Sequence, residues 1–448
     1  MAFSLIQFAS LLVFVIASVG HAVLWTAVLN HLYGRPLPKS LLRLWRYATA
    51  VLIASLPLGW AYFLLTSPVD TLAWVPSDGL DNEAIPEFHE HTATEITEPQ
   101  SRPPSHQLPE ATNELNHHDK TLRAVKHLAY AGHPGTAVLS GYVGVCLLLG
   151  GFVFPAVSWR RWRRRPPPSV RQQRSQWFDF WPEHGPQLIG DGCMAWAARL
   201  PGNDIFRLEV TELTLALPRL PAACNNLRLL VLSDFHFHGT PTYLWFERVL
   251  TTLAEGPTPD LVCLLGDYVD RDSHRAWIVP LLTRLHARYG KLAILGNHDV
   301  HHDPMQIRTA LQSAGCRLVG PAWQLVPVRG TTLAVIGHEG PWLPGPQRGL
   351  SPPADFFRLA LSHTPDNFYW AVTQQVDLML CGHVHGGQIR LPVIGPIFVP
   401  SRYSRRFDDG VFQKRGTVMA ICRGLSGREP LRFRCSPQAL RLTLTGDT

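Results

Sequence analysis

Three long stretches without charged residues constrain this 448-residue chain more than any other feature of its sequence. They cover residues 3–29, 47–66 and 136–159, and none of them contains Asp, Glu, Lys or Arg. A helix of about 20 apolar residues is long enough to cross a bilayer, and Pro57 and Pro155 are tolerated in such helices. A helix buried in a globular core could explain one such stretch, but not three in a row. We therefore predict three transmembrane helices.

The charges around these stretches predict their orientation. Basic residues gather in the link between the first two stretches and directly after the third: Arg35, Lys39, Arg43, Arg46 and the run 160–165. The segment 77–118 is instead acidic, rich in Pro and Glu, and poor in apolar residues, so we expect it to be disordered. The positive-inside rule places the basic ends in the cytoplasm and the acidic loop outside. The C-terminal half would then be cytoplasmic.

Composition bounds the rest of the chain. The net charge of +7 is modest, and the arginines next to the apolar stretches account for much of it. Such a cluster fits anionic lipid headgroups better than nucleic acid, so we expect the lipid bilayer as a partner and no nucleic acid. The eight cysteines include no Cys-x-x-Cys pair, which is typical of a reducing compartment. Residues 1–165 form the predicted membrane module, 166–192 a proline-containing linker, and 193–448 a folded domain.

Short apolar runs in this domain end at clusters of Asp, Asn and His. The runs cover residues 229–232, 261–265, 292–295 and 378–380, and they have the composition of buried strands. The clusters after them are Asp234-Phe-His236, Gly266-Asp267-Tyr-Val-Asp270, Gly296-Asn297-His298-Asp299 and Gly382-His383-Val-His385, and a fifth contains His363. Because α/β sheets carry their ligands at the C-terminal ends of parallel strands, we expect the clusters to meet at one edge.

This set of side chains predicts a metal site. Carboxylate and amide oxygens combined with imidazole nitrogens suit divalent Mn, Fe or Zn better than Ca. Any one of these short motifs is weak on its own, because a lone histidine at a strand end usually has a structural role. Five such clusters in order, most of them at strand ends, indicate a metal centre.

The five clusters resemble the motifs of the calcineurin-like metallophosphoesterase superfamily: Asp-x-His, Gly-Asp-x-x-Asp, Gly-Asn-His-Asp, a lone His and Gly-His-x-His. The resemblance runs from about residue 227 to the C-terminus. Segments 361–366 and 382–388 are similar to the bacterial, membrane-associated phosphodiesterase branch, which is related to UDP-2,3-diacylglucosamine hydrolases. Two segments depart from that branch: Gly427-Arg428-Glu429 replaces a turn of small residues, and His338-Glu339 stands where a Gly-x-Asp pattern is typical.

The resemblance implies a four-layer α/β/β/α sandwich after the transmembrane helices, and a centre of two divalent ions (Mn, Fe or Zn). It assigns Asp234, His236, Asp267 and His385 to the first ion, and Asp267, Asn297, His363 and His383 to the second. Asp267 would bridge the ions, because two cations about 3.5–4 Å apart require a shared anionic ligand. A hydroxide held between the ions would attack phosphorus in line.

Two further residues would take part in catalysis. His298 resembles the acid that protonates the leaving oxygen, and Asp270 would orient its imidazole through a hydrogen bond. A helix N-cap is the alternative role for Asp270. Asp299 would serve either as a structural cap or in catalysis, and His338 could face the substrate pocket.

Together these features predict an integral protein of the bacterial inner membrane with a cytoplasmic catalytic domain. We expect it to be a metal-dependent hydrolase of a phosphodiester or phosphomonoester in a lipid-linked substrate. The alternatives are a phosphoprotein phosphatase or a nuclease of the same superfamily, and a non-catalytic metal-binding sensor. Because every ligand position is filled and His298 is present, the enzyme is favoured over the sensor.

Overall fold

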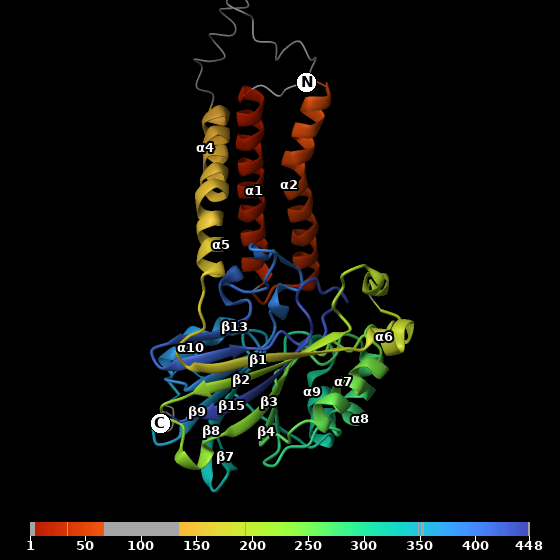
Figure 1. The fold of residues 1–448 in the computed structure, drawn as a ribbon, viewed down its shortest axis with the longest axis vertical. Coiled ribbons are helices and arrows are strands. Elements are labelled where there is room, and N and C mark those ends of the chain that lie inside the picture. The colour runs from red at the N-terminus through yellow and green to blue at the C-terminus, as the bar shows by residue number, and fades with distance from the viewer. Residues whose placement is uncertain are drawn as a thin grey trace, which may run out of the picture.

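The structure is a computed structural model of the chain, and it describes residues 5–33, 35–66, 134–192, 194–347, 349–350 and 354–446. Its long axis runs from a bundle of three helices to an α/β domain (Figure 1). The acidic segment 77–118, for which the sequence predicts disorder, lies outside the described residues.

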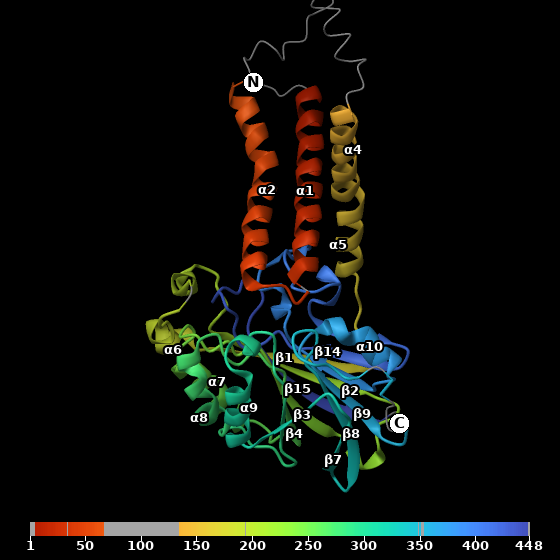
Figure 2. The ribbon, with the colours of Figure 1, turned by 180° about the vertical axis from the view of Figure 1, so that it is seen from behind.

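Three long helices stand side by side in the bundle (Figures 1 and 2). They are α1 (Leu5–Tyr33), α2 (Lys39–Thr66) and a third helix composed of α4 (Pro134–Leu148), the π-helical turn η2 (Leu149–Val153) and α5 (Phe154–Trp162). Within them, Phe8–Tyr33, Ser40–Gly59 and Val138–Trp162 are long and apolar enough to cross a membrane. Few residues of these segments are buried, which suits side chains that face lipid rather than a protein core.

Close contacts hold the bundle together. A Cβ atom at Gly20 of α1 would lie only 1.7 Å from the carbonyl oxygen of Cys146 in α4, so no larger residue fits there. Small residues let helices approach in this way where there is no hydrophobic drive between them. His21 donates a hydrogen bond of 2.6 Å from its Nε2 to the carbonyl oxygen of Leu52 and so ties α1 to α2.

Two β-sheets form the centre of the C-terminal domain. The first has the order β1 (Val170–Asp179), β2 (Arg207–Ala216), β15 (Gln438–Thr445), β3 (Leu227–Leu232), β4 (Leu261–Leu264), β5 (Lys291–Ala293) and β6 (Cys316–Leu318). The second has the order β13 (Gly410–Lys414), β14 (Thr417–Ile421), β10 (Leu378–Cys381), β9 (Phe357–Ser362), β8 (Thr331–His338) and β7 (Gln324–Val328). The runs β3 to β6 and β8, β9, β10, β14 are parallel.

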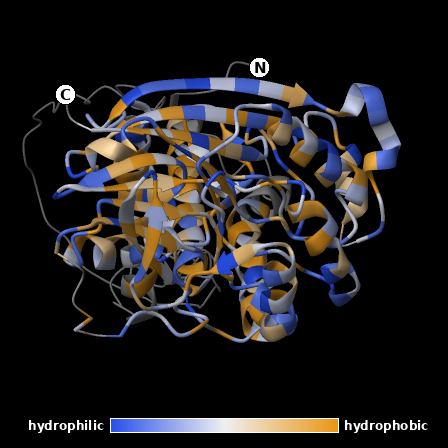
Figure 3. Ribbon diagram, turned by 90° about the horizontal axis from the view of Figure 1, so that it is seen from below, coloured by the Kyte–Doolittle hydropathy of each residue, from blue (hydrophilic) through white to orange (hydrophobic). Residues whose placement is uncertain are grey.

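The two sheets pack face to face with helices on their outer sides. Leu229 and Val231 of β3 enter the apolar core between the sheets, whereas Leu230 and Leu232 enter the core against the helices. Strands buried on both faces read as continuous apolar runs, as found here. The outer helices are α7 (Tyr243–Glu255), α8 (Ile278–Leu282) and α9 (Pro304–Ser313) on the first sheet and α10 (Phe368–Thr373) on the second. Figure 3 shows hydrophobic residues gathered on these inner strands. The predicted four-layer sandwich is confirmed.

One strand lies where the sequence predicts a linker. Within the predicted linker 166–192, Val170–Asp179 forms β1, which pairs antiparallel with β2 at the edge of the first sheet. Most of its residues are exposed, so it lacks the apolar pattern that marks a buried strand. Only its backbone pairing with β2 identifies it. The sheet therefore begins close behind the third helix of the bundle.

The loops that follow β10 lie between the bundle and the sheets (Figure 1). They contain the hairpin β11 (Arg390–Leu391) and β12 (Gly395–Pro396) and the turn η10 (Ser404–Phe407). Asn30 of α1, which is fully buried, accepts a hydrogen bond from the Val399 amide at 3.0 Å and donates one to Ser404 Oγ at 2.9 Å. Arg46 of α2 pairs with Glu429 at 3.1 Å. The bundle is thus docked on these loops.

Candidate metal centre

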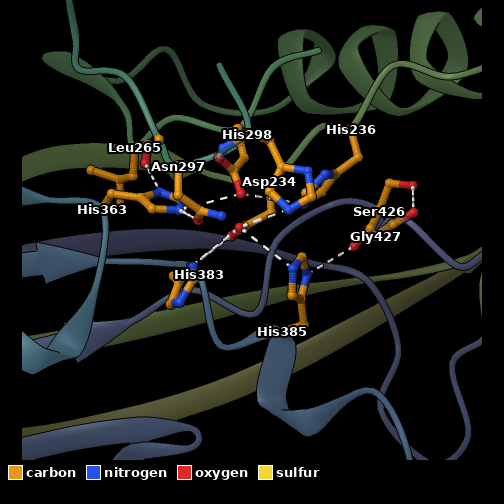
Figure 4. Close-up of polar contacts among 12 residues, drawn as sticks. Asp234, His236, Leu265, Asn297, His298, His363, His383, His385, Ser426 and Gly427 are labelled. Atoms are coloured by element: carbon orange, nitrogen blue, oxygen red, sulfur yellow. Dashed lines mark hydrogen bonds and ion pairs between the residues drawn. The ribbon is translucent and has the colours of Figure 1, made fainter. Parts of the chain in front are cut away.

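The predicted metal ligands meet at the C-terminal edge of the two sheets (Figure 4). They lie on the loops after β3, β4, β5, β9 and β10, at positions Asp234, His236, Asp267, Asn297, His363, His383 and His385. Parallel strands bring their C-terminal ends to one edge, which is why residues so distant in sequence converge.

Asp267 lies at the middle of the cluster. Its Oδ2 is 3.6 Å from Nε2 of His236 and 3.3 Å from Nε2 of His363. Oδ1 of Asp234 is 3.9 Å from Nε2 of His236 and 3.8 Å from Nε2 of His385. Ligand atoms that surround one ion at about 2.1 Å lie about 3–4 Å from one another. The observed spacings therefore match ligand atoms arranged around ions.

The predicted ligands form two groups joined by Asp267. Ligand atoms of Asp234, His236 and His385 lie within 4.8 Å of one another, as do those of Asp267, His363 and His383. A third set within the same limit, His236, Asp267 and His298, overlaps both groups and brings His298 next to them. Asn297 joins the second group, because its Oδ1 is 2.9 Å from Nε2 of His363. These are the two ligand sets that the resemblance implies, and the structure brings all their members together.

The polar atoms at the centre of this cluster fit a divalent cation. Oδ2 of Asp267 and the Nε2 atoms of His236 and His383 are buried without a hydrogen-bond partner among the described residues. Each such atom costs about 1–3 kcal/mol when it is left unsatisfied, and a cation would satisfy all three. The mixture of carboxylate, amide and imidazole donors suits Mn, Fe or Zn.

Hydrogen bonds on the far side of the rings fix which nitrogen faces the cluster. His363 donates from Nδ1 to the carbonyl oxygen of Leu265 at 2.7 Å, and His385 donates from Nδ1 to that of Ser426 at 3.2 Å. His236 donates from Nδ1 to Oδ2 of Asp270 at 3.1 Å. A proton held on Nδ1 leaves Nε2 free to bind a metal, as outer partners of metal-binding histidines generally do.

The backbone at the cluster is strained. Five of the predicted ligands have left-handed φ angles: Asp234 (53°), His236 (48°), Asp267 (57°), His383 (71°) and His385 (50°). This conformation costs a residue with a Cβ atom roughly 1–2 kcal/mol. Such strain persists where the surrounding fold enforces it, typically at functional sites. Gly382 is required for a different reason, because a Cβ atom there would lie 1.9 Å from Ser233 Oγ.

The histidines of the cluster differ in the direction of their pKa shifts. Burial opposes the protonation of His236, but Asp270, Asp267 and Asp234 raise its pKa to about 9. Burial also opposes the protonation of His363, and Asp267 and Asp234 raise its pKa to about 9. In contrast, burial and the neighbouring His363 hold the pKa of His383 well below its usual value. The metal-free cluster therefore carries protons on His236 and His363 at neutral pH.

His298 lies beside the cluster, and of the two histidines that contact Asp270 it is the more exposed to solvent. Its side chain is 18% exposed, and its Nδ1 donates to Oδ1 of Asp270. The other carboxylate oxygen of Asp270 accepts from His236. Burial disfavours the charge on Asp270, but His298 and His236 together lower its pKa well below the usual value. The predicted pairing of Asp270 with His298 is present, and Asp270 also holds a predicted ligand.

Asp299 has a structural position. It is fully buried, and its Oδ2 accepts hydrogen bonds of 2.8 Å from the backbone amides of Asp267 and Gly296. Its Oδ1 accepts from the amides of Tyr268 at 2.8 Å and Val269 at 3.3 Å. The carboxylate thus fastens the loop after β4 to the loop after β5, which is the cap or turn role rather than the catalytic one.

The His338-Glu339 departure is also structural. Nδ1 of His338 accepts from the Gly340 amide at 3.2 Å, and burial lowers its pKa to about 4, so the ring is a neutral acceptor. Glu339 is buried and accepts from the Leu295 amide at 2.7 Å, and it also pairs with Arg308. These contacts fix the loop that leads from β5 into the site.

Two further residues at the site lie outside the five sequence clusters. The Trp342 ring lies 4.8 Å from the His383 ring and 5.9 Å from the His363 ring, between centroids, and so forms a wall of the second group. Arg432, which is fully buried, donates to the carbonyl oxygen of His385 at 2.9 Å and to that of Arg423 at 3.0 Å. A tryptophan in an irregular loop carries no periodic signal, and the buried position of Arg432 depends on tertiary packing.

Comparison with known proteins identifies this arrangement. The model of the calcineurin-like phosphoesterase family matches residues 227–387, which contain every predicted ligand. The metallophosphoesterase YkuE of Bacillus subtilis is 32% identical over 246 residues, covering 53% of this chain and 85% of that protein. The fold and the site define a metal-dependent phosphoric ester hydrolase. The chain belongs to the calcineurin-like phosphoesterase family.

Two further relatives carry more specific names. Phosphodiesterase YaeI of Escherichia coli is 28% identical and covers 48% of this chain and 82% of its own length. The UDP-2,3-diacylglucosamine pyrophosphatase LpxG of Chlamydia trachomatis is 26% identical and covers 55% of this chain and 91% of its own length. The aligned portions amount to about half of this chain in each case.

Proposed function

We propose that this chain is a membrane-embedded, two-metal phosphoesterase that hydrolyses a lipid-linked phosphoester at the cytoplasmic face of the membrane. The observation that carries the proposal is the docking of the bundle beside the site. Asn30 at the end of α1 binds the loop at Val399 and Ser404, which follows His383 and His385 along the chain. The name of the LpxG relative, which acts on a diacylated sugar nucleotide, supports a lipid-linked substrate.

The first ion would be held by Asp234, His236, Asp267 and His385, and the second by Asp267, Asn297, His363 and His383. When bound, two such ions activate a water molecule and polarise the phosphoryl group. The outer hydrogen bonds of His236, His363 and His385 hold these ligands in place.

The remaining residues act on the substrate directly or through a neighbour. His298, with Nδ1 held by Asp270, presents Nε2 to protonate the leaving oxygen. Asp270 keeps the imidazole in this tautomer. Trp342, beside the rings of His363 and His383, positions the group attached to the phosphorus.

Substrate assays test the proposal. Purified full-length protein in detergent with added Mn²⁺ is assayed against matched pairs of substrates: a diacylated sugar nucleotide and its deacylated form, a phospholipid and its headgroup phosphodiester, a phosphopeptide and an oligonucleotide. The proposal expects turnover of an acylated substrate at a higher kcat/KM than its soluble counterpart. Preference for a soluble member, the phosphopeptide or the oligonucleotide would contradict it.

A pair of ligand variants tests the metal assignment. Asp267→Asn should lower the affinity of both ions, because it removes the anion shared by the two groups. Asp234→Asn should weaken mainly the first ion, since its carboxylate lies beside the imidazoles of His236 and His385 and contacts His383 only at the backbone amide. Metal analysis after equilibrium dialysis measures both effects. An Asp267→Asn protein that holds two ions with unchanged affinity would refute the bridging role.

A further inference from the structure

A pocket of about 370 Å³ lies where the third helix of the bundle meets the α/β domain. Its walls come from the end of α5 and the residues just after it, from the β11–β12 hairpin, and from the chain before Cys435. The lining residues that matter here are Arg161, Trp162, Arg164, Arg390, Val393 and Arg434. None of the predicted metal ligands lines it, so this pocket is separate from the metal centre.

The pocket carries an excess of positive charge. Behind its four arginines lies Asp408, fully buried, which pairs with Arg161, with Arg164 at 3.6 Å and with Arg390 at 3.2 Å. Asp409 pairs with Arg390 at 3.5 Å but is shared with Arg423, which does not line the pocket. Arg434 is exposed, and within the described ranges it forms no ion pair. An anion in the pocket would balance this charge.

The surroundings of the pocket are those of a membrane interface. Trp159 and Trp162 at the end of the third helix are 52% and 62% exposed, and Val393 in the turn of the hairpin is 68% exposed. Tryptophan is enriched at the depth of lipid headgroups, because its apolar ring can contact the acyl chains while its N–H group contacts water. Exposed apolar side chains therefore stand next to an arginine pocket at the membrane end of the catalytic domain.

We propose that this pocket binds the phosphate of an anionic membrane lipid. Guanidinium groups bind phosphate oxygens through paired, charge-assisted hydrogen bonds, and basic pockets at the cytoplasmic ends of membrane helices take anionic headgroups. Arg434 supplies donors that no described side chain uses, while Trp162 and Val393 contact the chains of the same lipid. The proposal rests on the proposed embedding of the helices, and it does not depend on which substrate is cleaved.

Native mass spectrometry of the metal-loaded, full-length protein tests this site. Every sample carries His298→Asn to slow lipid turnover, and the titrants are phosphatidic acid, phosphatidylcholine and inorganic phosphate. Arg434→Gln is compared with Arg163→Gln, since Arg163 is also exposed and lies beside the same helix end but contacts Trp159 outside the pocket. Thermal melting of both variants confirms that they are folded.

The expected result is that Arg434→Gln weakens binding of phosphatidic acid about tenfold, because a hydrogen bond to a charged group is lost. Arg163→Gln should weaken it clearly less, and phosphatidylcholine should not compete. Equal losses in the two variants would mean general attraction to the membrane surface and would overturn the site. Displacement of phosphatidic acid by inorganic phosphate at comparable concentration would overturn the lipid as its ligand. A soluble preferred substrate in the assays above would refute the proposed function but leave this test unaffected.

Discussion

Asp270 contacts the imidazoles of both His236 and His298. The substitutions His298→Asn and Asp270→Asn should therefore differ in their effects on bound metal. His298→Asn removes the acid but leaves Asp270 bound to His236, so the bound metal should remain and kcat should fall by about 10²–10⁴-fold. The loss should be largest for substrates with poor leaving groups, which need a proton, and smallest for p-nitrophenyl esters. Kinetics across leaving groups together with metal analysis measure this. Loss of metal, or equal losses for all leaving groups, would identify His298 as a ligand.

Asp270→Asn should differ from His298→Asn in its effect on metal. The carboxylate accepts the Nδ1 proton of His236 at 3.1 Å, and removing such an outer partner typically weakens metal affinity about 10–100-fold. The asparagine variant should therefore show a lower kcat and a weaker first ion. Titration of Mn²⁺ followed by electron paramagnetic resonance measures both sites, and an unchanged first site would contradict the role of this contact.

Metal affinity should rise with pH between about 7 and 9. The pKa values of His236 and His363 are each raised to about 9 in the metal-free cluster, so both rings are protonated at pH 7 and must lose a proton to bind an ion. Each ion then competes with one proton, and its apparent affinity should increase about tenfold per pH unit up to pH 9. Calorimetry in buffers of different ionisation enthalpy reports the released protons. Binding without proton release at pH 7 would contradict this.

At the scale of elements, the strand ends could be predicted and the docking loops could not. The runs before Asp234, Asp267 and His383 are buried on both faces, so composition alone marks them as strands. The edge strand β1 is polar and exposed, and only its pairing with β2 defines it. Likewise, the Gly427-Arg428-Glu429 departure has no local signal for its role. Glu429 pairs with Arg46 of α2, a contact that depends on the arrangement of distant segments.

The docking of the third helix depends on Asp408. Its carboxylate is fully buried among Arg161, Arg164 and Arg390, so its removal takes away the anion that these partly exposed cations share. We expect Asp408→Asn to lower the free energy of unfolding by about 1–3 kcal/mol, because the arginines keep part of their contact with water and Arg390 also pairs with Asp409. Thermal and denaturant unfolding of the detergent-solubilised protein measure the change. Asp303→Asn, at a surface helix cap, is the control and should leave the free energy of unfolding nearly unchanged, because Asn and Asp cap helices about equally well.

For the whole molecule, the charges around the bundle predict its topology. The basic residues Arg35, Arg43 and Arg46 lie at the ends of α1 and α2 nearest the catalytic domain (Figure 1), as the positive-inside rule requires of a cytoplasmic domain. A reporter fused after Thr448 should read cytoplasmic, and one inserted near Gln100 should read external. Fusions of phosphatase and fluorescent-protein reporters distinguish the two. An external C-terminus would overturn the predicted orientation.

If the bundle crosses a bilayer as proposed, the contacts of Asn30 and Arg46 would also set the distance of the catalytic domain from the membrane. A domain on a flexible tether samples many depths, whereas one fastened by Val399, Ser404 and Glu429 has its metal centre at a single depth. Such an enzyme would select substrates by the distance of their phosphorus atom from the membrane. A phosphoester whose phosphorus lies too close to the acyl chains, or too far out along a long headgroup, would miss the ions even if its chemistry were suitable.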